Sequence, residues 1–223
     1  MSENVFIPPS IARAPGVFGE REGIPVEKGV GMTENFLERN FELLSKYADL
    51  WIAYPDLFID LITPVDSTFR LYFYQRVFMR VAIRYRYSYA TFTRAFSKSF
   101  LSILTMYLRC IFLPRSKLFI CADVLRQAVK IAKEKLDEIW HFFPLLKREL
   151  LSHNMSQDYF TLTFYNGSVL DVVSTATSQR GGRRHGGIIE EAATIDGDEL
   201  SSVVLPLMNV NRRDHNGRLN PNE

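Results

Sequence analysis

Residues 92–100, with the sequence FTRAFSKSF, match the pattern of a phosphate-binding loop that lacks its glycines. In the usual loop, G-x-x-x-x-G-K-[ST], backbone amides surround the phosphates, the lysine reaches the terminal phosphates and the hydroxyl ligates magnesium. Lys98 and Ser99 supply the lysine and the hydroxyl, whereas Phe92 and Ser97 stand where the glycines belong. If the loop needs a left-handed backbone at residue 97, serine adopts it at a cost on the order of 1 kcal/mol. A Ser-Lys-Ser triplet is common in polar loops, so the motif predicts a nucleotide site only together with its neighbours.

A second group of chemically capable residues lies in 178–194, SQRGGRRHGGIIEEAAT. A Gly-rich basic loop leads into a short apolar strand that ends at Glu190 and Glu191. One carboxylate at the tip of a strand can hold magnesium through water, while the next orients and deprotonates an attacking water. Two glutamates followed by Ala-Ala could instead begin a helix, where acidic residues favour the positive end of the dipole. Both interpretations are open from this segment alone.

A strand, a loop and a buried helix are the elements that a phosphate motif requires. Residues 87–93, YSYATFT, alternate aromatic residues with small or β-branched ones, and therefore predict a strand that enters the loop. Residues 100–112, FLSILTMYLRCIF, are apolar on nearly every face and predict a helix buried against a sheet. This order of elements supports nucleotide binding.

The segments that follow indicate an α/β fold. Residues 117–122, KLFICA, predict an interior strand, and the strongly periodic residues 123–143 predict a helix. Residues 159–173 contain two alternating runs around Asn166-Gly167, which predicts a hairpin. The alternation of strands and helices predicts a mostly parallel central sheet flanked by helices.

The N-terminal third predicts an arm and a helical lead-in. Residues 1–32 are rich in proline and glycine and lack a sustained period, which indicates a flexible arm. Residues 33–68 predict two helices, the second of which begins at Pro55 and stops before Pro64.

Residues 69–86 predict a further helix with an apolar stripe and a basic stripe at Arg76, Arg80 and Arg84. The plain interpretation of the basic stripe is a solvated face. On the same helix, Tyr74 and Gln75 offer an aromatic ring that can stack on a base and an amide that suits an adenine edge.

Bulk properties set the class of protein. The chain has 223 residues, of which 47% are hydrophobic, and a net charge of +2, so it can bury a sizeable core and its charge alone does not indicate a nucleic-acid binder. Cys110 and Cys121 lie in apolar segments and predict neither disulfides nor a metal site, and the four histidines show no metal-binding spacing. No signal peptide is visible, and the apolar run 100–113 is too short to span a membrane. We therefore expect a soluble protein of a reducing, cytosolic compartment.

Together, these segments resemble the ATPase domain of the large subunit of tailed-phage terminases, the motors that drive double-stranded DNA into procapsids. The resemblance covers about residues 51–213 and rests on four segments: YQR at 74–76, TRAFSKSF at 93–100, KLFICADVLRQA at 117–128 and RGGRRHGGIIEEAA at 180–193. Many members of that family carry a similarly deviant loop, with an arginine four residues before the lysine and a serine at the second glycine. Arg94 and Ser97 match that pattern.

The resemblance implies a P-loop NTPase fold of the additional-strand class, with ATP and Mg²⁺ as cofactors. It assigns adenine recognition to Gln75, and phosphate sensing and charge stabilisation to Arg94. Lys98 would hold the phosphates, and Glu191 would be the catalytic base, so that Glu191, Arg94 and Lys98 form the expected catalytic set. Magnesium would be held by Ser99 and, through water, by Glu190, where most relatives have aspartate. The residues expected to bind ATP are Tyr74, Gln75, Arg94, Ala95, Phe96, Ser97, Lys98 and Ser99.

Three arginines of the Gly-rich loop, Arg180, Arg183 and Arg184, have two open interpretations. They contact DNA phosphates or the nucleotide of a neighbouring subunit, or they belong to a solvated basic loop.

The resemblance also implies partners and a location. We expect double-stranded DNA, a portal protein and a small terminase subunit as partners, a ring-shaped homo-oligomer during packaging, and no membrane. The location would be the cytoplasm of an infected bacterial host, with transient docking at the procapsid. Family members continue with another strand and a nuclease domain, so residues 69–223 would form a C-terminally truncated ATPase core with an incomplete sheet and poor activity in isolation. The alternatives are a helicase-like nucleic-acid translocase and a non-catalytic terminase fragment that acts as a binding module.

Overall fold

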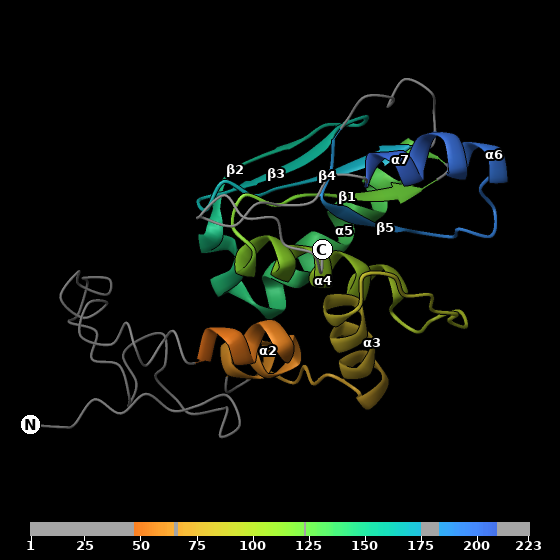
Figure 1. Ribbon diagram of the computed structural model, residues 1–223. Coiled ribbons are helices and arrows are strands. Elements are labelled where there is room, and N and C mark those ends of the chain that lie inside the picture. The colour runs from red at the N-terminus through yellow and green to blue at the C-terminus, as the bar shows by residue number, and fades with distance from the viewer. Residues whose placement is uncertain (1–46, 65–66, 123, 175–182, 209–223) are drawn as a thin grey trace, which may run out of the picture. The chain divides into compact units, whose positions relative to one another are not determined.

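The computed structural model of this chain describes residues 47–64, 67–122, 124–174 and 183–208 (Figure 1). The chain divides into two compact units, one up to Arg84 and one from Tyr85 onward. The predicted N-terminal arm, residues 1–32, lies outside the described residues. The segment 69–84, which the sequence assigned to the ATPase core, belongs to the first unit.

The first unit contains helical residues 47–53, α2 (Pro55–Ile62) and α3 (Phe73–Arg84). Proline opens α2 because its fixed φ suits the first helical position and its missing N–H would have no partner there. The predicted end of this helix before Pro64 is confirmed, whereas α3 begins four residues later than the segment predicted from residue 69.

Two arginines of the basic stripe of α3, Arg76 and Arg80, pair with carboxylates of α2, so the stripe is not simply a solvated face. The guanidinium of Arg76 lies 2.6 Å from Asp60, and that of Arg80 lies 2.7 Å from the fully buried Asp56. Hydrogen bonds to these carboxylates raise the pKa of both arginines above the usual value. Arg84 is exposed and donates to the backbone carbonyl of Ala53, in helical residues 47–53, at 2.8 Å. A buried carboxylate requires such partners, and the stripe therefore holds α2 and α3 together.

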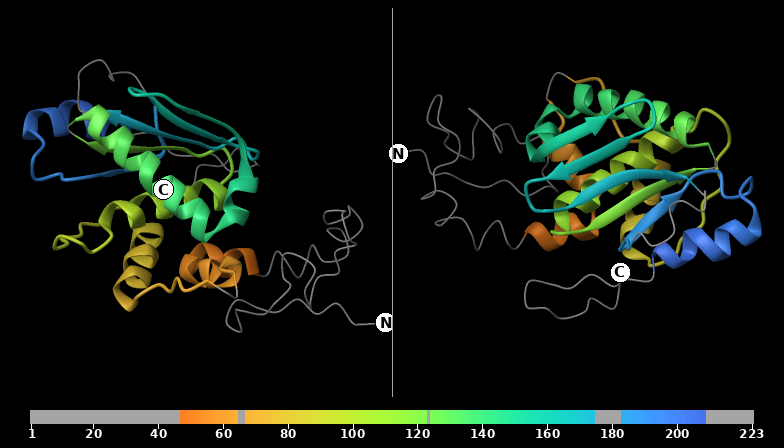
Figure 2. Two further views of the ribbon diagram at one scale, coloured as in Figure 1. Left: turned by 180° about the vertical axis from the view of Figure 1, so that it is seen from behind. Right: turned by 90° about the horizontal axis from the view of Figure 1, so that it is seen from above.

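The second unit is built on a five-stranded sheet in the order β2-β3-β4-β1-β5 (Figure 2). Its strands are β1 (Lys117–Ala122), β2 (Leu150–Met155), β3 (Phe160–Phe164), β4 (Val169–Ser174) and β5 (Gly186–Ile189). β1 pairs with β4 and β5 in parallel, whereas β3 pairs with β2 and β4 antiparallel. The α/β fold is confirmed, but the sheet is mixed and not mostly parallel, because the hairpin and β2 add two antiparallel pairings.

Helices cover both faces of this sheet. α4 (Lys98–Phe112) and α5 (Leu125–Phe142) lie on one face, and the 3₁₀ turn η2 (Pro144–Glu149) follows α5 (Figures 1 and 2). On the other face lie α6 (Gly197–Glu199), the π-helical turn η4 (Leu200–Val204) and α7 (Leu205–Leu207). α4 is buried on nearly every side, as its apolar sequence predicts. None of the described helices combines the length and the apolar character needed to cross a membrane.

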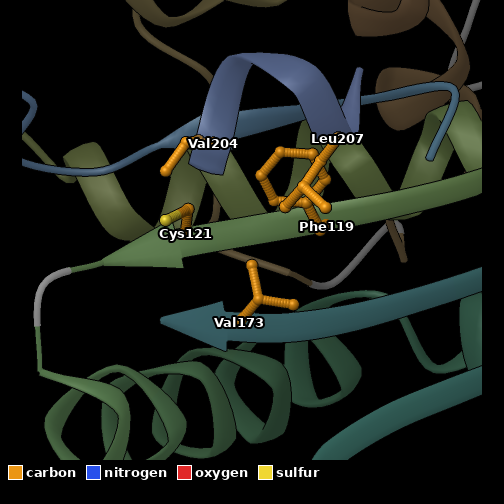
Figure 3. Packing of buried hydrophobic residues seen from close by; sticks show 5 residues of the cluster. All are labelled: Phe119, Cys121, Val173, Val204 and Leu207. Atoms are coloured by element: carbon orange, nitrogen blue, oxygen red, sulfur yellow. The ribbon is translucent and has the colours of Figure 1, made fainter. Parts of the chain in front are cut away.

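A small core joins the second helical layer to the centre of the sheet. Val204 and Leu207 pack over Phe119 and Cys121 of β1 and Val173 of β4 (Figure 3). Because these side chains alternate with those that face α4 and α5, both faces of β1 are apolar, which explains the unbroken run KLFICA.

The predicted hairpin is confirmed between β3 and β4. Gly167 has a φ of +81°, a left-handed conformation that glycine adopts without strain. The side chain of Asn166 accepts a hydrogen bond from the backbone N–H of Ser168 at 3.0 Å and donates to the carbonyls of Cys110 and Ile111 at 2.7 and 2.9 Å. The turn therefore also satisfies carbonyls at the end of α4.

The strand predicted at residues 87–93 is not formed. Residues 88–93 have no regular secondary structure, and the side chains of Tyr87 and Tyr89 are exposed. Alternation alone does not make a strand, because backbone groups need a paired neighbour. Within the described residues β5 pairs only with β1, and no strand pairs with this segment.

Candidate phosphate site

The loop before α4 has a left-handed backbone at two residues that are not glycine. Ala95 has a φ of 68°, and Ser97 has φ 53° and ψ 29°, so both lie in the left-handed region. The left-handed backbone that the sequence analysis considered for Ser97 is therefore the one observed. Each such residue costs on the order of 1 kcal/mol, and strain of this kind concentrates at functional sites. Left-handed residues within a turn also help to direct backbone N–H groups toward one concave side, which is a common way of binding anions.

The N-terminus of α4 adds a second attraction for an anion. Lys98 and Ser99 are its first two residues, and its N-cap Ser97 makes no side-chain capping hydrogen bond. The first turn carries no acidic residue. The first-turn N–H groups and the positive end of the helix dipole are thus not engaged by a capping side chain, which is the arrangement that binds phosphate groups.

Glu190 and Glu191 lie at the carboxyl end of β5. The backbone N–H of Glu190 donates to the carbonyl of Cys121 at 2.8 Å and so extends the ladder with β1. The chain then turns at Glu191, whose φ is 52°. The next helix begins only at Gly197, where the side chain of Asp196 caps it. The predicted position of the two glutamates at the end of a strand is therefore confirmed, and the alternative that they begin a helix is wrong.

The two groups of residues that the sequence singled out meet in this unit. The ammonium of Lys98 lies 3.3 Å from Oε1 of Glu191 and 3.6 Å from Oε2 of Glu190. The hydroxyl of Ser99 donates to Oε2 of Glu190 at 3.2 Å. These contacts join residues 93 and 91 positions apart in the chain.

The donor set at this point fits a hard divalent cation. The Glu190 side chain is 12% exposed, and its Oε1 is buried with no hydrogen-bond partner among the described residues. A buried carboxylate oxygen without a partner is costly unless a ligand satisfies it. Carboxylate and hydroxyl oxygens are the ligands that Mg²⁺ prefers. Glu190 and Ser99 therefore satisfy the fit expected for a magnesium site.

The glycines before the glutamates have a structural role that the sequence reasoning missed. A Cβ on Gly187 would lie 2.6 Å from the carbonyl oxygen of Phe119 and 2.7 Å from its ring. Only glycine allows β5 to approach β1 this closely. The Gly-Gly pair that opens β5 was the available signal.

Arg184 of the Gly-rich loop is an internal ion-pair partner. Its guanidinium binds the carboxylate of Asp171 on β4, with 3.2 Å between Nε and Oδ1, and both side chains are largely buried. Burial raises the pKa of Asp171 above its usual range, and Arg184 acts in the opposite direction. The solvated-loop interpretation therefore does not describe Arg184, whereas contact with DNA phosphates or with the nucleotide of a neighbouring subunit stays a prediction. Arg183 is exposed, and Arg180 lies outside the described residues.

The other predicted ATP-binding residues divide between the two units. Arg94, Ala95 and Phe96 are exposed in the loop before α4. Tyr74 and Gln75 lie on α3 in the first unit. Gln75 is buried, and its Oε1 accepts the backbone N–H of Tyr72 at 2.8 Å at the start of α3. This capping contact was not foreseen, and the role of Gln75 in adenine recognition stays a prediction.

No protein-family model matches this sequence, and no curated protein sequence matches it. The resemblance to terminase large subunits therefore stays a prediction from the residues.

Proposed function

We propose that this chain binds ATP with Mg²⁺ and hydrolyses the terminal phosphoanhydride, as the ATPase part of a viral DNA-packaging motor of the terminase large-subunit type. One observation carries the proposal. Lys98 and Ser99, at the start of a buried helix, contact Glu190 and Glu191, at the carboxyl end of a parallel strand. Parallel strands in α/β folds commonly bind phosphorylated ligands at this end.

The roles follow from chemistry and position. Lys98 and the first-turn amides of α4 would hold the phosphates, and Ser99 and Glu190 would hold Mg²⁺. The metal supplies positive charge that neutralises the phosphate oxygens. Glu191 is 65% exposed and can accept a proton from an attacking water. Most of the rate would come from positioning and charge stabilisation.

The balance of charges explains why metal and nucleotide would bind together. One ammonium faces two carboxylates, which leaves the cluster with a net negative charge. This charge attracts a divalent cation and opposes a nucleotide without metal. The P-loop NTPase fold, double-stranded DNA, the portal protein and the small terminase subunit belong to this proposal through the resemblance.

A binding module without turnover is the second candidate, because one structural observation favours it. The segment before the loop, residues 88–93, is not paired in the sheet within the described residues. A loop whose preceding segment is not paired in a sheet can retain phosphate affinity and still lack the rigid positioning that hydrolysis needs.

Calorimetry with ATP-Mg²⁺ and single-turnover hydrolysis together test the proposal. We expect the unmodified chain to bind and hydrolyse ATP, and Lys98→Ala to lose both. Glu191→Gln should keep binding and lose roughly 10²-fold or more in rate, as removal of a general base does. Lys130→Ala is the matched control, because this lysine is exposed on α5 and, among the described residues, its ion pair is with Glu134.

The outcomes separate the candidates. Binding without hydrolysis by the unmodified chain would support the binding module. Absence of binding at millimolar ATP-Mg²⁺, or an effect of Lys98→Ala no larger than that of Lys130→Ala, would contradict both. Hydrolysis stimulated equally by single-stranded and double-stranded nucleic acid would support a helicase-like translocase over a packaging motor.

A further inference from the structure

We propose that Thr194, which lies outside the predicted site residues, positions the carboxylate of Glu191 for the hydrolysis proposed above. This inference depends on that function, because it assigns the residue that orients the expected general base. Thr194 acts through the backbone of Glu191 and does not itself contact the reacting groups.

The backbone of Glu191 needs support because its φ of 52° is left-handed. Residues other than glycine rarely adopt this conformation unless the surrounding structure holds it. On the N-terminal side, the hydrogen bond from Glu190 to the Cys121 carbonyl at 2.8 Å fixes the chain to β1. A matching constraint is therefore needed on the C-terminal side.

Thr194 supplies that constraint with two hydrogen bonds. Its backbone N–H and its hydroxyl both donate to the carbonyl oxygen of Glu191, each at 2.8 Å. The two residues between them are Ala192 and Ala193, whose methyl side chains cannot form hydrogen bonds. The hydroxyl of Thr194 thus provides the one side-chain bond that closes this turn within the described contacts.

The Glu191 carboxylate has little else to orient it. The side chain is 65% exposed, and among the described residues its polar contact is with Lys98 at 3.3 Å. Lys98 would move toward phosphates when a nucleotide binds, which would remove that contact. The direction of the carboxylate then depends on the turn that Thr194 closes.

The test compares three variants in the full chain by single-turnover hydrolysis and by calorimetry with ATP-Mg²⁺. Thr194→Val keeps the branched shape and removes the hydroxyl, while Thr194→Ser keeps the hydroxyl. Ser201→Ala is the control, because Ser201 makes an exposed hydroxyl–carbonyl bond to Asp198 over the same spacing.

We expect Thr194→Val to lose on the order of tenfold in rate at saturating nucleotide, since a small misplacement of a reacting group lowers the rate strongly. Its affinity for ATP-Mg²⁺ should not change, Thr194→Ser should keep most of the rate, and Ser201→Ala should match the unmodified chain. A wild-type rate in Thr194→Val, an equal loss in Thr194→Ser, or a loss of affinity in place of rate would overturn the role of Thr194 alone. An unmodified chain that does not hydrolyse ATP would overturn the proposed hydrolysis as well, and this failure is visible before any variant is made.

Discussion

The ion pair between Arg184 and Asp171 gives a test of the fold that does not depend on function. It joins the segment before β5 to the centre of the sheet, and the backbone N–H of Arg184 also donates to the carbonyl of Leu207 at 2.8 Å. Arg184→Met keeps an unbranched side chain and removes the charge. The carboxylate of Asp171, which is 16% exposed, would then be left largely buried without its partner.

The expected loss at neutral pH is about 2 kcal/mol of unfolding free energy. Removing one partner of a fully buried ion pair costs about 3–5 kcal/mol. A hydrogen bond to a charged group contributes about 1.5–3 kcal/mol. The smaller of these two ranges applies here, because the Arg184 side chain is 22% exposed and water can partly solvate the carboxylate of Asp171.

The loss should depend on pH with a defined sign. Burial raises the pKa of Asp171 in the folded protein, and Arg184 lowers it, so Arg184→Met raises it further. A raised folded-state pKa means that the folded protein holds the proton more tightly than the unfolded chain. Stability therefore falls as pH rises from the usual aspartate value, about 3.9, through the folded-state pKa. The extra loss in the variant should be largest near neutral pH and smallest in acid, where the carboxyl group is protonated in both states.

Urea unfolding followed by circular dichroism at several pH values measures this loss. Arg183→Met is the matched control, because Arg183 is the adjacent arginine and is exposed. In an Asp171→Asn background, the effect of Arg184→Met should lose its pH dependence. A loss for Arg184→Met no larger than that for Arg183→Met at neutral pH, or a loss that does not shrink in acid, would contradict a stabilising ion pair at this position.

Two further predictions concern the backbone of the site. Gly187→Ala should destabilise by about 3 kcal/mol, the upper range for overpacking, because its Cβ would meet the backbone of Phe119 at 2.6 Å. Gly186→Ala should have little effect, because the atom nearest to its added Cβ would be a side-chain carbon of Leu118 at 3.7 Å. Equal melting temperatures for the two variants would contradict the close approach of β5 to β1. Ser97→Gly should stay within about 1 kcal/mol of the unmodified protein, since relief of the left-handed serine offsets the greater freedom of glycine when unfolded. Ser97→Val should destabilise clearly more than Ser97→Gly, because a β-branched residue resists the left-handed conformation. Urea unfolding that ranks the two variants in the opposite order would contradict this prediction.

Local patterns predicted much of the fold. Three predictions were correct because each sequence signal lies within one element. They are the buried helix α4 from its apolar run, the helix α5 from its period, and the strand at residues 117–122. The hairpin was correct because Asn166-Gly167 specifies a turn by itself. The two groups of site residues were also singled out from the sequence, and the resemblance to terminase ATPases implied that they share one site.

Features that depend on distant partners could not be predicted. Residues 87–93 alternate as a strand does, yet no described strand pairs with them. β2 was missed because its exposed, polar sequence LLSHNM follows no alternating pattern. The role of Arg184 depends on Asp171 of another strand, and the capping contact of Gln75 depends on where α3 begins. For residues 87–93 and for Arg184, the deciding partner lies outside the segment that carries the signal.

The position of β5 has a consequence for how the site comes into existence during folding. α4, α5 and the β3–β4 hairpin consist of contacts between near neighbours in the chain, and we expect them to form early. The contact between Lys98 and Glu191 spans 93 residues and requires β5 to dock beside β1, which closes the longest loop last. A partly folded chain can therefore have most of its helices and its hairpin and still have no site. Any activity at this cluster would report that β5 has docked beside β1.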